Sequence, residues 1–185
     1  MNLYYDSEFT GLHQNTTFIS LALVAEDGHA FYAEFTDYDA GQCDDWIRDN
    51  VLAHTRWLNR PGAETGLWRE PPLTLCHGNK AAVRDALAQW LAQYDSIRIW
   101  ADCPAWDWVL FCELFGGALH IPDNIHYLPL DLATLFKARG YDPDIDREGF
   151  AGQSFAGEAR GKKHNALYDA RLLMACHKKL EDGMA

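Results

Sequence analysis

The chain has 185 residues and a formal net charge of −11, and 48% of its residues are hydrophobic. This length suits one well-buried domain and is too short for two of ordinary size, so we expect a single domain over residues 1–185. The acidic charge disfavours a protein that wraps long duplex DNA, because Lys and Arg supply most of that affinity. A nucleic-acid substrate would therefore need bound cations or a few local basic residues.

The five cysteines lie far apart and include no C-x-x-C pair, which indicates buried thiols in a reducing compartment. The first residues show no basic region followed by an apolar stretch, as a signal peptide would. No apolar run approaches the roughly 20 residues that span a bilayer. We therefore expect a cytoplasmic protein without a membrane anchor.

The first 58 residues predict a three-stranded meander followed by a helix. Residues 3–7, 17–25 and 29–35 read as strands, because they are rich in β-branched, aromatic and alternating apolar side chains. Glu26-Asp27-Gly28 is a hairpin turn signal between the second and the third. Apolar residues recur at helical spacing over residues 41–58.

The middle of the chain predicts a loop and a second set of elements. Residues 59–72 are rich in Pro and Gly and predict a long loop. Asn79 is an expected N-cap for a helix that extends to residue 94. Residues 97–101 form a short apolar strand, and residues 106–115 form a helix that ends at a Gly-Gly pair.

The last part predicts a short strand at residues 127–130 and helices at 131–139 and 165–180, whereas residues 141–163 show no periodicity. A leading meander followed by alternating helices and strands predicts an α/β fold. Its mixed sheet would combine the antiparallel meander with parallel strands and be covered by helices.

The first chemical motif is Asp6-Ser7-Glu8, at the end of the first strand. Residues two apart on a strand point to the same face, so both carboxylates converge. Adjacent carboxylates repel each other, and a hard divalent cation relieves that repulsion. The alternative interpretation of this triplet is a solvated turn.

The second and third motifs each contain an acid at the start of a helix. Asp107 follows the strand at 97–101, where it is either a functional acid among aromatics or a first-turn residue favoured by the helix dipole. His164 precedes the cap residue Asn165, and Asp169 falls in the first turn of the last helix. A loop histidine beside a helical carboxylate suits a general base next to a metal, or is an ordinary surface residue.

Taken together, the three motifs resemble those of the DEDDh 3′–5′ exonuclease family, whose fold is ribonuclease H-like. The residues that carry the resemblance are Asp6, Glu8, Asp107, His164 and Asp169. The h type has His five positions before the last Asp, as here, whereas the y type would need Tyr at the position of Asn165. Related members are ribonuclease T, oligoribonuclease and proofreading exonuclease subunits, and the chain is most similar to small bacterial and phage exoribonucleases of a mycobacterial type.

The second motif departs from the family pattern. The family commonly has Asn four residues before the Asp, and this chain has Cys103 there. Asp107 is therefore the site residue that most needs to be located in space, and Asp102 is its alternative.

The resemblance implies two divalent cations, Mg²⁺ or Mn²⁺, held by Asp6, Glu8, Asp107 and Asp169. Asp6 would bridge both ions, and His164 would take the proton from the attacking water. The implied reaction releases nucleoside 5′-monophosphates from the 3′ ends of RNA, or of single-stranded DNA. Homodimers are common in the family, so a homodimer is an expectation.

The resemblance also places four residues near the substrate. Phe9 and Leu12 stand where a stacking side chain and a wedge are expected, next to Thr10 in the first motif, and core packing is the alternative for Leu12. Lys163 belongs to a basic group around the third motif, which either holds phosphates or is solvated surface charge. The group consists of Arg160, Lys162, Lys163 and Arg171.

Two rival functions fit the same residues. One is a nucleic-acid-binding subunit with this fold and little turnover. The other is a metal-dependent phosphatase for small phosphoesters, which would explain the acidic charge without nucleic acid. A haloacid-dehalogenase-type phosphatase would need Asp where Glu8 stands.

Overall fold

The structure is a computed structural model that describes residues 1–60, 62–152, 155 and 162–183. A mixed seven-stranded sheet forms its centre, with the strand order β4-β5-β3-β2-β1-β6-β7. The strands are β1 (Asn2–Phe9), β2 (Phe18–Ala25), β3 (Ala30–Phe35), β4 (Gly66–Glu70), β5 (Leu73–Gly78), β6 (Arg98–Ala101) and β7 (Leu130–Asp131). The first three pair antiparallel, and β6 and β5 run parallel to β1 and β3. This confirms the α/β fold with a mixed sheet, as expected of a ribonuclease H-like protein.

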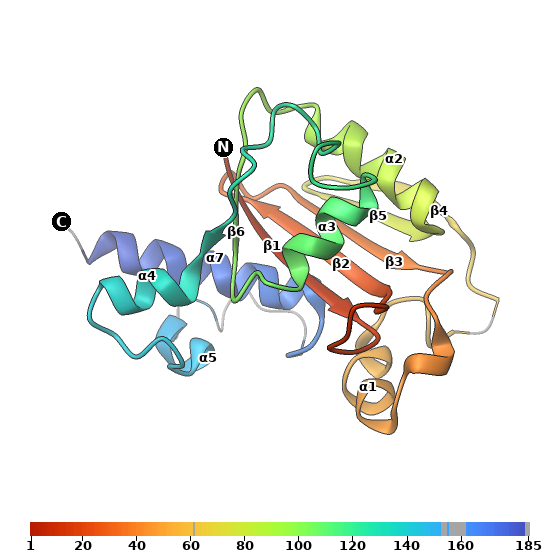
Figure 1. The fold of residues 1–185 in the computed structure, drawn as a ribbon, viewed down its shortest axis with the longest axis horizontal. Coiled ribbons are helices and arrows are strands. Elements are labelled where there is room, and N and C mark those ends of the chain that lie inside the picture. The colour runs from red at the N-terminus through yellow and green to blue at the C-terminus, as the bar shows by residue number, and fades with distance from the viewer. Residues whose placement is uncertain (61, 153–154, 156–161, 184–185) are drawn as a thin grey trace.

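Helices cover both faces of the sheet (Figure 1). One face packs against α2 (Lys80–Leu91) and α3 (Asp107–Leu114), and the other against α4 (Leu132–Ala138), α5 (Arg147–Ala151) and α7 (Ala166–Asp182). A short helix, α1 (Asp45–Asn50), lies near the carboxyl end of β1. In the part of the chain that the structure describes, no helix combines the length and apolar character needed to span a bilayer.

Alternation along β1 divides the hydrophobic core into two halves. Leu3 and Tyr5 are buried on the side of α2 and α3, whereas Tyr4 is buried on the side of α7. Successive residues of a strand point to opposite faces, so Asp6 and Glu8 continue the row of Tyr4. The first motif therefore faces α7.

Two short segments differ from the sequence prediction because they form a hairpin. β4 lies inside the predicted loop 59–72, and β5 follows it directly as its antiparallel partner. β4 is the edge strand of the sheet and ends in Arg69 and Glu70, so its composition resembles that of a polar loop. The predicted loop was wrong over these residues.

The predicted helix at residues 41–58 is also wrong, because the segment breaks into three short pieces. These are α1 and the 3-10 turns Ala40–Gln42 and Leu52–His54. The fully buried carboxylate of Glu34 accepts the backbone N–H groups of Arg56, Trp57 and Leu58. Those amides are therefore not available to the carbonyl groups of a continuing helix.

Both predicted asparagine caps are confirmed. Asn79 accepts a hydrogen bond from the N–H of Ala82 at 2.9 Å, and Asn165 accepts one from Tyr168 at 3.3 Å. Of the predicted strand at 127–130 only Leu130 is in a strand, as the first of the two residues of β7, and the segment at 141–163 contains the helix α5.

Candidate active site

A cleft of about 470 Å³ opens at the carboxyl ends of β1 and β6. The end of β1, the loop after β6, residues 143–148 and the start of α7 form its walls. The lining includes all five predicted catalytic residues: Asp6, Glu8, Asp107, His164 and Asp169. A larger hollow of about 620 Å³ lies beside β5 and α2, and its described lining residues include a single carboxylate, Asp85. The first cleft, which contains all five predicted catalytic residues, is therefore the candidate active site.

Three carboxylates converge in this cleft. Asp6 and Glu8 project from the same face of β1, and Asp169 faces them from the first turn of α7. One carboxylate oxygen from each of the three lies within 4.8 Å of those of the other two. The fully buried Ala166 and Ala170 let α7 approach the sheet closely, which brings Asp169 within reach of β1.

Burial raises the pKa of each carboxyl group in this cluster, and repulsion within the cluster adds to the rise for Asp6 and Glu8. Burial is the largest cause for Glu8 and Asp169, raising the pKa of Glu8 to about 8 and that of Asp169 to about 7. Burial, followed by the charges of Asp169 and Glu8, raises the pKa of Asp6 well above its usual range. Among the described residues, none of the three forms an ion pair with a basic side chain. Three clustered oxygen donors without an ion-pair partner among the described residues fit a hard divalent cation.

Asp107 is held at the side of the cluster by β1 itself. β6 pairs with β1 only as far as Tyr4 and ends at Ala101, so the next stretch of β1 has an open edge. There the Asp107 carboxylate accepts the backbone N–H of Ser7 at 3.0 Å and its hydroxyl at 2.6 Å, both through Oδ1. Burial raises the pKa of Asp107, whereas these two bonds oppose the rise.

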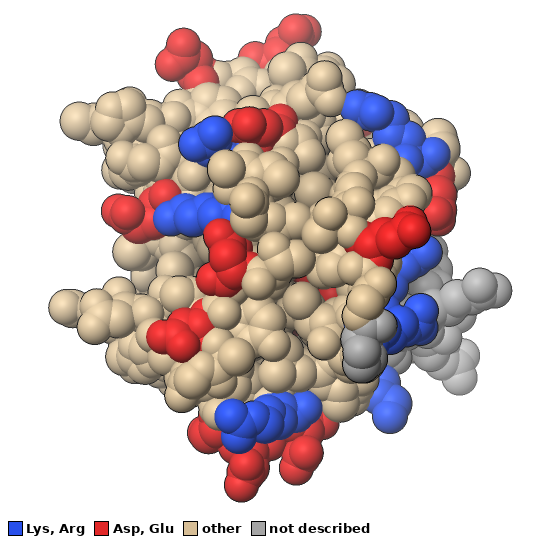
Figure 2. All heavy atoms as spheres, turned by 90° about the vertical axis from the view of Figure 1, so that its right-hand side faces the viewer, with Lys and Arg blue, Asp and Glu red and all other residues tan. Residues whose placement is uncertain are grey.

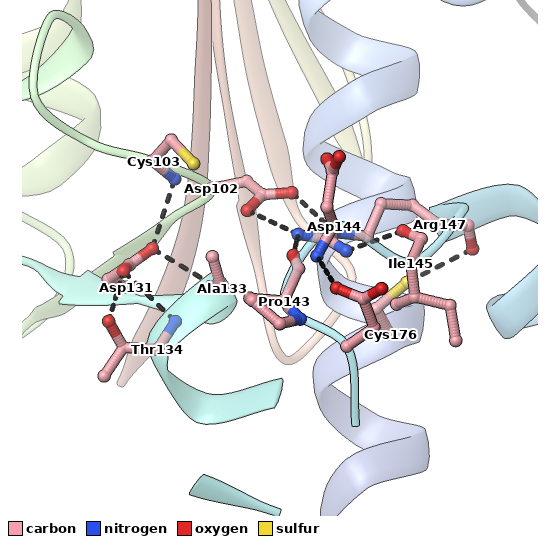
Figure 3. Close-up of polar contacts among 11 residues, drawn as sticks. Asp102, Cys103, Asp131, Ala133, Thr134, Pro143, Asp144, Ile145, Arg147 and Cys176 are labelled. Carbon is pink, nitrogen blue, oxygen red and sulfur yellow. Dashed lines mark hydrogen bonds and ion pairs between the residues drawn. The ribbon is translucent and has the colours of Figure 1, made fainter. Parts of the chain in front are cut away.

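Asp102 does not take the place of Asp107, because it is already paired. Figure 3 shows Arg147 reaching its carboxylate with two hydrogen bonds, of 2.7 and 3.0 Å. The neighbouring Asp131 accepts the N–H of Cys103 at 3.1 Å and also caps α4 through Ala133 and Thr134. Asp102, Cys103 and Asp131 lie close enough to hold a metal, yet both acids already have protein partners.

The structure fixes the backbone of His164 more firmly than its ring. The residue has φ +65°, and its N–H donates to Oδ2 of Asp169 at 2.8 Å. Burial lowers the pKa of the imidazole, and the nearby charges of Lys163 and His54 lower it further. A histidine with a lowered pKa is neutral at neutral pH and has a ring nitrogen that can accept a proton.

A hydrogen-bond network that the sequence motifs did not indicate positions the third motif. Asn165 caps α7 with its oxygen, and its Nδ2 donates to the carbonyl of His54 at 3.0 Å and to the Tyr32 hydroxyl at 3.5 Å. The Tyr32 hydroxyl donates to the buried Glu34 at 2.6 Å, and this is the carboxylate that binds the amides of residues 56–58. A lone Glu in the apolar strand β3 was the available signal, since a buried charge requires partners.

Comparison with known proteins gives the family. The model of the 3′-5′ exoribonuclease Rv2179c-like domain matches residues 1–180. The chain belongs to the Rv2179c-like family. It is 30% identical over 142 residues to the 3′-5′ exoribonuclease Rv2179c of Mycobacterium tuberculosis strain H37Rv, and equally to MT2234.1 of strain CDC 1551. Each alignment covers 76% of this chain and 76% of the relative.

In this Rv2179c-like chain the four predicted substrate residues differ in exposure. Phe9 and Lys163 line the cleft, and Leu12 is 74% exposed in the loop that follows β1, so it is not a core residue. Thr10 is buried, accepts the N–H of Thr17 at 2.9 Å and donates to Gln42 at 2.5 Å. Its side chain supports the loop from beneath, a geometry that does not favour direct contact with a substrate.

Basic side chains do not form a continuous surface on the face of the Rv2179c-like domain that Figure 2 shows, where acidic and basic groups are interspersed. Within the predicted basic group, Lys162 and Lys163 are exposed and Arg171 is half-buried, whereas Arg160 lies outside the described residues. If side chains of this basic group bind phosphates, they therefore do so locally at the cleft, where Lys163 lies.

Proposed function

We propose that this protein is a metal-dependent 3′–5′ exoribonuclease that acts on single-stranded or overhanging 3′ ends and releases nucleoside 5′-monophosphates. One observation carries the proposal: Asp6, Glu8 and Asp169 converge within 4.8 Å in a cleft that also contains His164, in a chain of the Rv2179c-like family. The names of the mycobacterial relatives support the same activity.

The carboxylate cluster is suited to hold two divalent cations, Mg²⁺ or Mn²⁺. Asp6, Glu8 and Asp169 would hold the metal, and Asp107, held beside them by Ser7, would contribute a further carboxylate. When bound, such ions lower the pKa of a nucleophilic water and offset the charge of the phosphodiester. Their positive charge also explains how an acidic protein binds a polyanion without a large basic surface.

His164 is the proposed general base. It lines the cleft beside Asp169, and its lowered pKa leaves the imidazole neutral and able to accept a proton near pH 7. The N–H bond to Asp169 ties the backbone of this base to a residue of the metal cluster. The base therefore keeps a fixed place relative to the expected cations.

The rim of the cleft suits a terminal nucleotide. Phe9 lies in the lining and offers an aromatic ring to an unstacked base, and Leu12, three residues further on, is an exposed aliphatic side chain in the loop that follows. Lys163 lies in the lining as a point charge for a phosphate. The overall charge of −11 disfavours long duplexes, so we expect single-stranded ends to be the better substrates.

The test is digestion of matched 5′-labelled single-stranded RNA, single-stranded DNA and 3′-overhang duplexes, with Mn²⁺ or with EDTA. The expected product is a descending ladder that requires the metal and is formed fastest on RNA. Asp6→Asn should abolish it, and Asp123→Asn, which changes an exposed carboxylate outside the cleft, should leave it intact.

Three results would contradict the proposal. Immediate release of a labelled mononucleotide would show the opposite polarity. Equal activity of the wild type and Asp6→Asn would remove the cluster from the reaction. Faster turnover of a chromogenic phosphomonoester than of any oligonucleotide would favour a phosphatase.

A further inference from the structure

Among the described residues, the ring of His164 has no polar partner of the kind that usually orients a catalytic histidine. In many enzymes a third group holds the general base by a hydrogen bond to its other ring nitrogen. Here the backbone N–H of His164 binds Asp169, but neither ring nitrogen is hydrogen-bonded to any described residue. Within the described part of the chain, a contact of another kind bears on the rotation of the imidazole.

The indole of Trp46 makes that contact. Its ring and the ring of His164 meet edge to face, with centroids 5.0 Å apart and planes at 73°. Edge-to-face contacts at this distance are favourable arrangements of two π systems. Among the described residues this is the ring contact that His164 makes.

Trp46 contacts His164 without itself lining the cleft. His164 is among the lining residues of the cleft, whereas Trp46 is not. Trp46 is also 53% exposed on α1, which is a high exposure for a large aromatic side chain with charged neighbours in sequence. Core packing therefore does not account for its position.

The position of Trp46 is set by the rest of α1. Asp44 caps the helix by accepting the N–H of Ile47 at 2.8 Å. Ile47 and Val51 are buried in a small cluster with Ile19 of β2. The helix is thus anchored to the sheet on its other side, and the indole it presents to His164 is held by a rigid base.

We infer that Trp46 is a positioning residue that orients the imidazole of His164 toward the carboxylate cluster. This inference rests on the proposed function, in which His164 is the general base. An indole can fix the rotation of an imidazole by shape without donating or accepting at its nitrogens. Both ring nitrogens then remain available, one to accept the proton from water and the other to face solvent.

The kinetic test compares Trp46→Leu, Trp46→Phe and the wild type on a short single-stranded RNA with Mn²⁺. Trp46→Leu removes the aromatic ring, so we expect kcat to fall by roughly 10- to 100-fold, with KM changed by less than about twofold. Trp46→Phe keeps an aromatic ring and should restore most of kcat. Tyr127→Leu, an exposed aromatic outside the cleft lining, is the matched control and should match the wild type.

A double-mutant cycle separates an action through His164 from an action on the substrate. In the His164→Ala background, Trp46→Leu should cause no further loss of kcat, because the group that it positions is gone. The same loss in both backgrounds would overturn the inference, and so would a rise in KM alone, which would indicate contact with a nucleobase. A Trp46→Leu enzyme with wild-type kcat would also overturn it.

The contact can be measured without turnover. In ¹H–¹³C spectra of the metal-free protein, the ring C–H signals of His164 are those absent from His164→Ala. They should move in Trp46→Leu and stay near their wild-type positions in Tyr127→Leu, because ring currents of the indole act on them. Unchanged signals would refute the contact, whereas moved signals in a protein without exonuclease activity would refute the proposed function and leave the contact standing.

Discussion

Ser7 gives both its backbone N–H and its hydroxyl to one oxygen of Asp107, at 3.0 and 2.6 Å. Ser7 lies between Asp6 and Glu8 in β1. The residue between these two carboxylates of the cluster therefore holds Asp107, another predicted metal ligand. The bond substitutes for the strand pairing that β1 loses where β6 ends. The first and second motifs are thereby joined by the backbone of one strand.

Ser7→Ala should lower kcat by roughly tenfold, because removing the hydroxyl leaves Asp107 held by a single N–H bond and free to turn. The backbone bond remains, so the melting temperature should change little. Steady-state kinetics on RNA and a thermal melt measure the two effects. Unchanged kcat would show that the orientation of Asp107 is not important for the reaction.

Divalent cations should stabilise the folded protein, because they bind the cluster in the native state alone. At about 100 times Kd, Mn²⁺ should raise the melting temperature of the wild type by roughly 5–10 °C. Without metal, Asp6→Asn should melt higher than the wild type, since it removes one of three mutually repelling carboxylates. Calorimetry with and without Mn²⁺ tests both points, and an equal metal-induced shift in the two proteins would contradict the site.

Replacing Arg147 alone should destabilise the protein more than replacing Arg147 and Asp102 together. The pair is bidentate and largely shielded, with 18% and 32% of the two side chains exposed. Arg147→Met leaves Asp102 unpaired near the cluster, which we expect to cost about 2–3 kcal/mol of unfolding free energy. A double-mutant cycle measures this coupling: urea denaturation gives the unfolding free energy of the Arg147 variant, the Asp102 variant and the variant that carries both changes. A double variant as unstable as the sum of the single variants would show that the pair has no coupling.

His177 should make stability depend on pH in a predictable direction. Burial lowers its pKa below the usual value near 6.5, against the opposing charges of Glu181 and Glu26 and with the help of Arg139. The unfolded chain then binds a proton that the folded protein rejects, so stability is full above about pH 6.5 and falls as the pH drops below it. The Tyr4 hydroxyl, 3.0 Å from Nδ1, faces the ring from β1.

The variant His177→Gln keeps an acceptor for Tyr4 and removes the titration. Urea denaturation at pH 7.5 and pH 5.5 should therefore show a smaller loss of stability on acidification than in the wild type. Parallel losses in the two proteins would mean that His177 does not titrate in this range.

Local signals predicted the parts of the fold that are encoded locally. β2 is buried along its whole length and its sequence is apolar throughout, and the caps at Asn79 and Asn165 depend on neighbours three residues away. β4 is different, because it is a strand only through pairing with β5, and its own residues are half polar. The break after α1 depends on Glu34, which is distant in sequence and takes the amides a helix would have used.

In the candidate site, too, the features set by neighbouring residues were predicted, and those set by tertiary packing were not. Spacing alone places Asp6 and Glu8 on one face, but the approach of Asp169 depends on how α7 packs against the sheet. At the departure in the second motif, Cys103 has φ +53°, a conformation that Asn adopts more readily than Cys. Asp107 nevertheless reaches β1 and binds Ser7 there. The choice between Asp107 and Asp102 needed the position of Arg147, which no spacing indicates.

The two ends of the Asn165 side chain have a consequence for what position 165 can accept. The oxygen starts α7 and the nitrogen holds the carbonyl of His54, so neither end is free. A side chain without both an amide oxygen and an amide nitrogen cannot perform the two tasks together. Replacing Asn165 would therefore need a new helix start and a new anchor for a distant loop at the same time. Residue 165 is thus constrained by the architecture around it, independently of the chemistry of its neighbour His164.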